Sequence, residues 1–115
     1  MENYPKSLEH YQDLMGELGD KIPQVMQAFG NLHQSAAADG VLDTKTKELI
    51  ALAIGVTVRC HGCIAYHVND AVQAGATREE IMETLGVAIM MGGGPSVIYS
   101  MEAMEALDQF MAEKK

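Results

Sequence analysis

The sequence has few aromatic residues: it contains no tryptophan, two phenylalanines and four tyrosines in 115 residues. Nine methionines and many aliphatic residues are present instead, and hydrophobic residues make up 48% of the chain. A core of such side chains suits the packing of helix on helix. The length is sufficient for one domain and too short for two. We therefore expect a single domain whose core needs no disulfide to hold it together.

Positive charge is also scarce. Eight lysines and arginines stand against 16 acidic residues, which gives a net charge of −8, and the basic residues form no run beyond Lys114-Lys115. A surface that binds nucleic-acid phosphates needs clustered basic residues, so we expect no nucleic-acid partner. The longest apolar run, residues 49–58, is too short to span a bilayer. Residues 1–6 are polar and lack the apolar segment of a signal peptide, so we expect a cytoplasmic protein with no membrane partner.

Apolar residues recur at helical spacing along most of the chain, and cap and turn signals divide this pattern into six segments. The expected helices are one capped by Ser7 that stops near Gly19, one from Pro23 to Asp39-Gly40, one over about residues 44–58, one over about residues 60–74, one capped by Thr77, and one that begins at Pro95. On the last helix we expect an apolar stripe to lie in the core or at a subunit interface. That stripe consists of Val97, Met101, Met104, Leu107 and Met111.

The second half of the third expected helix, residues 49–56, is apolar on every side. A helix that is hydrophobic all round is buried, either in the core or against another subunit. Its β-branched residues make a buried strand the competing interpretation, but the continuous length and the polar lead-in favour a helix. No strand pattern, linker or repeat stands out elsewhere. The predicted fold class is therefore an all-α, single-domain helical bundle.

Both cysteines of the chain lie in one short stretch. The stretch reads Arg59-Cys60-His61-Gly62-Cys63-Ile64-Ala65-Tyr66-His67. Cys60 and Cys63 share a helix face, at a spacing from which a disulfide can close with little movement. In a reducing compartment such a pair is more often redox-active or metal-binding than structural. The helix N-terminus, Arg59 and His67 would each favour a thiolate, and His67, four residues after Cys63, is placed to accept a thiol proton.

Glu48 belongs to the preceding helix, which a short connection joins to the cysteine-bearing helix as a hairpin. Counted from Arg59, Glu48 is eleven residues back and His67 is eight residues on. Along the paired helices the two residues are therefore offset by about one helical turn, or ~5 Å. A carboxylate at the edge of a buried stretch needs a partner. We therefore expect Glu48 to orient His67 and to accept its proton, which gives a Glu–His–Cys chain.

These residues together resemble the alkyl hydroperoxidase D-like (AhpD-like) members of the carboxymuconolactone decarboxylase superfamily. The shared pattern is Glu48, eleven residues, Cys60-x-x-Cys63, three residues and His67, and the resemblance extends over residues 43–99, about half of the chain. It implies an AhpD-like helical fold and a homo-oligomer, either a trimer or a hexamer. It also implies thiol-dependent reduction of a hydroperoxide or a disulfide by an enzyme with no cofactor besides a redox-active Cys60–Cys63 disulfide. The electron donor would be a dithiol or a thioredoxin-like protein.

The same resemblance implies a role for each of the four residues. Cys63 is the thiolate that attacks peroxide, and Cys60 donates a proton and resolves the product as a disulfide. Glu48 and His67 form the proton relay. AhpD itself has a histidine immediately before its second cysteine, where this chain has Gly62. The nearby His61 is one residue earlier, and because that shift turns a side chain by ~100° on a helix, we do not assign it the same role.

Two alternatives remain. A decarboxylase acting on a lactone acid, as in another branch of the superfamily, would need a general acid and base but not two thiols. A zinc-bearing or redox-sensing scaffold would use Cys60, Cys63, His67 and either His61 or His33 as ligands. Ligands confined to one helix face cannot easily surround an ion, which disfavours the zinc site.

Overall fold

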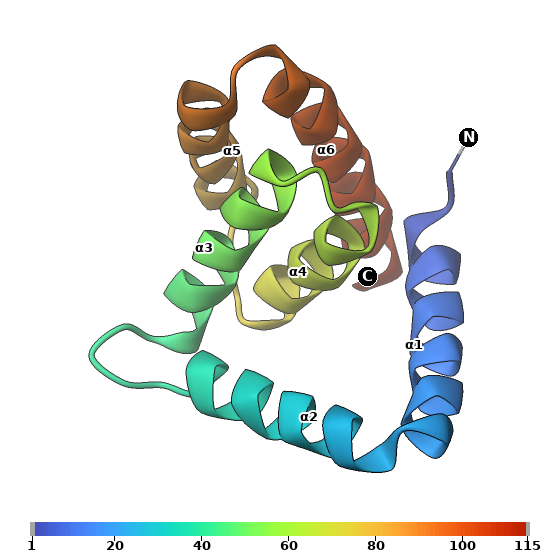
Figure 1. Ribbon diagram of the computed structural model, residues 1–115. Helices are drawn as coiled ribbons and strands as arrows, with labels where there is room; N and C mark the ends of the chain where they lie inside the picture. The colour runs from blue at the N-terminus through green and yellow to red at the C-terminus, as the bar shows by residue number, and fades with distance from the viewer. Residues whose placement is uncertain (1, 115) are drawn as a thin grey trace.

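The computed structural model describes residues 2–114, and this part of the chain forms six helices and no strand. The helices are α1 (Tyr4–Lys21), α2 (Pro23–Ala37), α3 (Thr44–Thr57), α4 (His61–Gln73), α5 (Arg78–Gly92) and α6 (Gly94–Lys114). The predicted all-α class is confirmed, and the competing strand over residues 49–56 is wrong. Helices α3 to α6 pack around one core, and α1 and α2 run along its side and beneath it (Figure 1).

Most helix boundaries follow the cap signals of the sequence. Asp43 caps α3 by accepting a hydrogen bond from the Thr46 N–H at 2.8 Å, and Thr77 forms a complete capping box with Glu80 at the start of α5. The first helix differs from the prediction, because it is capped by Asn3 instead of Ser7 and continues through Gly19. Pro5 explains the earlier start, since its fixed φ suits the first turn of a helix.

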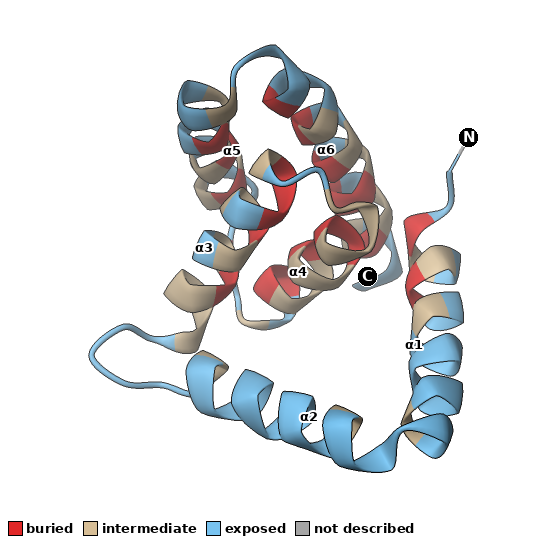
Figure 2. Ribbon diagram, in the orientation of Figure 1, coloured by how far each residue is buried: buried red, intermediate tan, exposed pale blue. Residues whose placement is uncertain are grey.

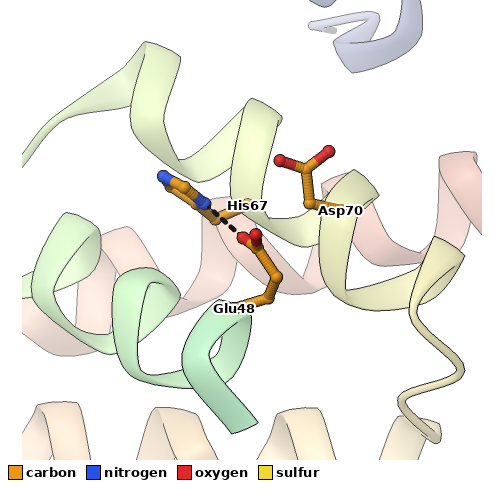
Figure 3. Close-up of side chains that lie close together, drawn as sticks. All are labelled: Glu48, His67 and Asp70. Atoms are coloured by element: carbon orange, nitrogen blue, oxygen red, sulfur yellow. Dashed lines mark hydrogen bonds and ion pairs between the residues drawn. The ribbon is translucent and has the colours of Figure 1, made fainter. Parts of the chain in front are cut away.

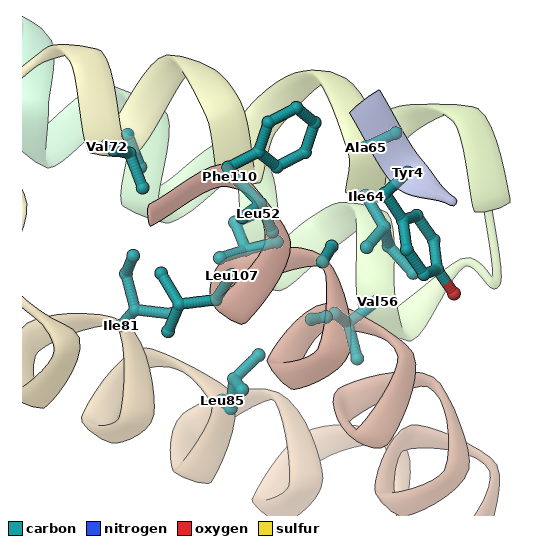
Figure 4. Close-up of a cluster of buried hydrophobic side chains, with 14 of the residues drawn as sticks. Tyr4, Leu52, Val56, Ile64, Ala65, Val72, Ile81, Leu85, Leu107 and Phe110 are labelled. Atoms are coloured by element: carbon teal, nitrogen blue, oxygen red, sulfur yellow. The ribbon is translucent and has the colours of Figure 1, made fainter. Parts of the chain in front are cut away.

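The core is aliphatic and is built mainly from the facing sides of α3, α4, α5 and α6 (Figures 2 and 4). Figure 4 labels ten of its members: Tyr4, Leu52, Val56, Ile64, Ala65, Val72, Ile81, Leu85, Leu107 and Phe110. The α1 helix contributes Tyr4 and Leu8 from its first two turns. The aliphatic part of the core predicted from the composition is confirmed, but the described buried cluster contains no methionine, and Met82 and Met111 only pack against it.

Helix α6 brings only part of the stripe that we predicted for the core or a subunit interface to the core, namely Leu107 and Met111. Of the predicted stripe, Leu107 is buried, but Val97, Met101 and Met104 are 41%, 54% and 43% exposed. The residues that α6 buries are mostly small: Ser96, Ser100, Ala103, Ala106, Leu107 and Phe110. Small side chains allow a helix to approach its neighbours closely, and α6 packs closely against α4 and α5. Close packing therefore explains why α6 buries its small residues and leaves Met101 and Met104 exposed.

The second half of α1 and all of α2, residues 14–37, extend away from the core as an arm (Figures 1 and 2). No residue of α2 is buried, although its sequence is amphipathic. The apolar side chains exposed on the arm are Leu14, Met15, Leu18, Ile22, Val25, Phe29 and Leu32. The sequence thus predicted the α2 helix correctly without indicating that its apolar side is uncovered. No helix within residues 2–114 is long and apolar enough to cross a membrane.

Candidate active site

The connection between α3 and α4 places both cysteines. Arg59 adopts a left-handed conformation with φ of 61°, and the Cys60 N–H donates to the Gly55 carbonyl at 2.9 Å, which closes α3. Cys60 is also the N-cap of α4, since its sulfur accepts a hydrogen bond from the Cys63 N–H at 3.2 Å. One residue therefore ends one helix and begins the next.

Cys60 and Cys63 form a disulfide, with their Cα atoms 5.2 Å apart. Both residues are partly exposed, so the sulfur pair is not sealed in the core. The backbone of α3 passes close beside it, because a Cβ placed on Gly55 would lie 3.2 Å from the Cβ of Cys63. Glycine at this position lets the two helices approach at the level of the disulfide.

Glu48 and His67 form the contact that the hairpin register predicted. Nδ1 of His67 lies 2.7 Å from a carboxylate oxygen of Glu48, which is only 5% exposed (Figure 3). An ionised carboxylate can only accept, so Nδ1 carries the proton in this pair. The other ring nitrogen, Nε2, points away from the carboxylate and is left as an acceptor in the neutral ring (Figure 3). His67 follows Cys63 by one turn of α4.

Asp70 is a third titratable group at this site, and the sequence analysis missed it. One carboxylate oxygen of Asp70, one of Glu48 and a ring nitrogen of His67 all lie within 4.8 Å of one another (Figure 3). Burial raises the pKa of Asp70, the negative charge of Glu48 raises it further, and His67 and His33 oppose this shift. Its position three residues after His67, on the same face of α4, was the available signal.

His33 reaches the site from α2, although the sequence analysis considered it only as a possible zinc ligand. Its ring lies 6.4 Å from that of His67, centre to centre, and nearly parallel to it. The two rings and Glu48 line an open cavity of about 140 Å³ between α2, α3 and α4. The remaining lining residues are Ala36, Ala37, Lys47 and Ala51. The cavity gives the buried side of the Glu48–His67 pair an opening to solvent.

His61 faces a different set of residues, on the flank where α1 and α6 meet α4. Its Nδ1 lies 2.9 Å from a carboxylate oxygen of Glu102 and its Nε2 lies 3.3 Å from one of Glu2. The hydroxyl of the buried Tyr4 donates to the same Glu102 oxygen at 3.2 Å. Burial acts to lower the pKa of His61, but its hydrogen bonds to Glu102 and Glu2 outweigh that effect and the net pKa is raised.

Gly62 stands where the AhpD pattern has a histidine, and its surroundings explain the difference. A Cβ on Gly62 would lie 3.3 Å from the ring of Tyr11. Helix α1 therefore occupies the space that a larger side chain at this position would need. Since His61 is held by Glu102 and Glu2, neither residue 61 nor residue 62 joins the Glu48–His67 pair.

The zinc ligand set considered from the sequence does not come together. The cysteines are bonded to each other, and His61 pairs with Glu102 away from His67. Among residues 2–114, the side chains that converge as a possible metal-ligand group are Glu48, His67 and Asp70. Carboxylate and imidazole ligands suit a divalent cation, but this group is also an acid–base cluster that requires none.

Four helices around one core and two along its side, with a CxxC disulfide at the start of α4 and a Glu48–His67 pair one turn away, define an all-helical CxxC protein. The family model of the carboxymuconolactone decarboxylase family matches residues 23–106. The chain belongs to this family. The match includes all four residues of the predicted site, and the family named by the resemblance is confirmed.

Several proteins are similar to this chain over nearly its whole length. A carboxymuconolactone decarboxylase family protein from Legionella pneumophila is 43% identical, with a TM-score of 0.92 over 96% of this chain and 98% of that one. A family member from Thermotoga maritima, described as "possibly involved in antioxidative response", is 32% identical, with a TM-score of 0.82 over 91% and 92% of the two chains. An uncharacterized protein from Haemophilus influenzae is 42% identical over 104 residues, 90% of this chain and 92% of that one.

Proposed function

We propose that this protein is a thiol-dependent oxidoreductase of the AhpD type, which reduces hydroperoxides with electrons from a dithiol or a thioredoxin-like donor. The observation that carries the proposal is the 2.7 Å hydrogen bond between Glu48 and His67, one helical turn from a partly exposed CxxC pair. A metal site or a structural disulfide would not need a buried acid–base pair beside it. The description of the Thermotoga maritima relative agrees with an antioxidant role.

The cycle begins from the dithiol. Nε2 of His67 takes the proton of the Cys63 thiol, directly or through one water, and Glu48 stabilises the resulting imidazolium. The Cys63 thiolate attacks one oxygen of R–O–O–H, the O–O bond breaks, and the leaving alkoxide takes the proton of the Cys60 thiol, which gives the Cys63 sulfenic acid and R–OH. The Cys60 thiolate then attacks the Cys63 sulfur and forms the disulfide, and the departing hydroxide takes the proton of His67 and leaves as water. The external dithiol reduces that disulfide and returns both thiols.

Reduction of a protein disulfide is the second candidate, because the same thiolate can attack S–S instead of O–O. The partly exposed CxxC pair favours it, since a second protein could reach the sulfurs. A lactone-acid decarboxylase is the third, favoured by the family that matches the chain. That reaction would use the acid–base groups and leave the thiols without a role, so oxidised and reduced protein would release CO2 from carboxymuconolactone equally well.

Turnover assays with cumene hydroperoxide and with a model disulfide, each with a dithiol reductant, test the proposal. We expect peroxide reduction that is abolished by Cys63→Ser. Cys60→Ser is the matched variant: treated with one equivalent of peroxide before the reductant is added, it should stop at a sulfenic acid on Cys63 that dimedone traps. Full peroxidase activity in Cys63→Ser protein would refute the mechanism. Activity on the disulfide alone would replace the peroxidase assignment with the reductase.

We further propose that the protein functions as a homo-oligomer, a trimer or a hexamer, in the reducing cytoplasm, with no nucleic-acid or membrane partner. The exposed apolar side chains of the arm support the oligomer, because isolated chains rarely leave so many large hydrophobic residues uncovered. The scarcity of basic residues supports the absence of nucleic acid.

A further inference from the structure

Asp70 is the titratable group of the site that the proposed cycle does not use. It lies one turn beyond His67 on α4, and one of its carboxylate oxygens is within 4.8 Å of one of Glu48, which comes from α3 (Figure 3). Glu48 is hydrogen-bonded to His67, whereas Asp70 has no ion pair or side-chain hydrogen bond within the described residues. The site therefore holds a second carboxylate beyond the one that orients the histidine.

The charged and titratable groups around Asp70 come from three helices. Glu48 lies on α3, His33 on α2, and both His67 and Tyr66 on α4. Lys47 lines the nearby cavity, but its ammonium donates to the Ala38 carbonyl at 2.6 Å. His67 is thus the cationic partner that Asp70 and Glu48 share when the relay is charged.

The charge of Asp70 acts more strongly on His67 than on the thiol. Asp70 is three residues from His67 but seven from Cys63, which is ~10 Å along a helix. A negative charge at that place stabilises the imidazolium more than it destabilises the thiolate, because Coulomb energy falls with distance. Ionised Asp70 therefore favours transfer of the thiol proton to His67.

We propose that Asp70 is a positioning residue of the proton relay, whose carboxylate acts with Glu48 to make His67 a stronger base toward the Cys63 thiol. This inference deepens the proposed function and rests on it for the role of the thiol. Glu48 orients the ring through Nδ1, and Asp70 adds charge without a bond to the reacting atoms. The relay thus has two carboxylates with separate tasks.

The test follows alkylation of the Cys63 thiol by iodoacetamide against pH, in reduced Cys60→Ser protein so that one thiol reacts. Asp70→Asn should slow alkylation at pH 7 about 3- to 10-fold and move the curve of alkylation rate against pH to higher pH. The reason is that the substitution removes a partly screened negative charge near His67. Asp70→Glu keeps the charge and should restore the rate to within about twofold of the Asp70 protein. Circular dichroism would establish that each variant keeps its helices.

Two results would overturn the inference. One is an Asp70→Asn profile that coincides with that of the Asp70 protein. The other is an effect of Asp70→Asn that disappears when a chelator is present, because a cation held by Glu48, His67 and Asp70 would then explain it. The proposed function fails separately: a shifted alkylation profile without peroxide or disulfide turnover would retain the role of Asp70 and reject the oxidoreductase.

Discussion

Glu48 is the buried acid on which the geometry of the site depends. It is 5% exposed, and its carboxylate is satisfied by the imidazole of His67. Removing one member of a buried hydrogen-bonded pair leaves the other unsatisfied, which typically costs about 1–3 kcal/mol of stability. Substitutions at this pair therefore act on both folding and chemistry, so the informative changes are the isosteric Glu48→Gln and the polar replacement His67→Gln.

Loss of the histidine should slow thiol deprotonation at neutral pH. We expect His67→Gln to reduce peroxide turnover about 10²-fold or more, the usual contribution of a general base, and Glu48→Gln to have a smaller effect because the base itself remains. Iodoacetamide alkylation of the reduced protein at pH 7 would measure the same step without peroxide. His10→Gln changes an exposed histidine of α1 and serves as the control. Unchanged alkylation in His67→Gln would remove the relay and leave Cys63 as the nucleophile.

Asp70 should lower the stability of the folded protein at neutral pH. Burial, and then the charge of Glu48, raise its pKa in the folded state, so the folded chain binds this proton more tightly than the unfolded chain. The stability that Asp70 contributes is therefore greatest at pH values below its pKa in the unfolded chain. It is lost as the pH rises through the higher pKa of Asp70 in the folded chain. We expect Asp70→Asn to raise the urea midpoint at pH 7 and to leave it nearly unchanged below pH 4. An equal gain at both pH values would show that charge is not the cause.

The four predicted site residues were accessible to sequence reasoning because their relations are local. Cys60, Cys63 and His67 share one helix, and a three-residue connection fixes the register of Glu48 against His67. Asp70 follows from the same spacing but was overlooked. His33 could not be found this way, because its position depends on how α2 lies across α3, and no pattern within α2 encodes that.

At the scale of the helices, close approach is decided by small residues. Gly55 brings α3 against the disulfide, and Ser96, Ser100 and Ala103 bring α6 into the core. The helical spacing of large apolar residues instead indicated the methionine-bearing face of α6 as the one that packs. Such spacing indicates where a helix forms, but it cannot tell a face packed by small side chains from one left outside.

Gly55→Ala should destabilise the protein, although alanine is the better helix former. The added Cβ would lie 3.2 Å from the Cβ of Cys63, which the disulfide and the α4 cap hold in place, so we expect a cost of about 1–3 kcal/mol in urea unfolding. Gly16→Ala, in the middle of α1 with nothing within 4 Å of the new Cβ, should instead stabilise by about 0.5–1 kcal/mol. Stabilisation by both substitutions would show that α3 and α4 can separate freely here.

For the whole molecule, the uncovered arm is the dominant surface feature. Phe29 and Leu32 of α2 are 50% and 63% exposed, and Ile54 and Val58 at the end of α3 are 55% and 63% exposed. The sequence indicated that residues 49–56 would be buried in the core or against another subunit. The structure buries Leu52 and Val56 in the core and leaves the outer side of α3 open. A second copy of the chain is the occupant that the oligomer proposal assigns to these surfaces.

Phe29→Asp should therefore lower the mass of the particle in solution. A carboxylate in a buried interface cannot remain hydrated, so we expect light scattering after size exclusion to show a shift from trimer or hexamer toward smaller species. Gln34→Asp places the same charge on the opposite, polar side of α2 and should leave the mass unchanged. A single-chain mass for the parent protein would reject the oligomer outright.

The backbone hydrogen bonds of Cys60 bear on which step of the proposed cycle limits its rate. Its N–H is bonded to the last turn of α3 and its carbonyl accepts from the Ile64 N–H at 3.0 Å in α4, and neither bond involves the sulfur. We therefore expect the disulfide to open by side-chain rotation, without unwinding either helix. We expect turnover to be limited by how quickly the electron donor reaches the oxidised Cys60–Cys63 disulfide.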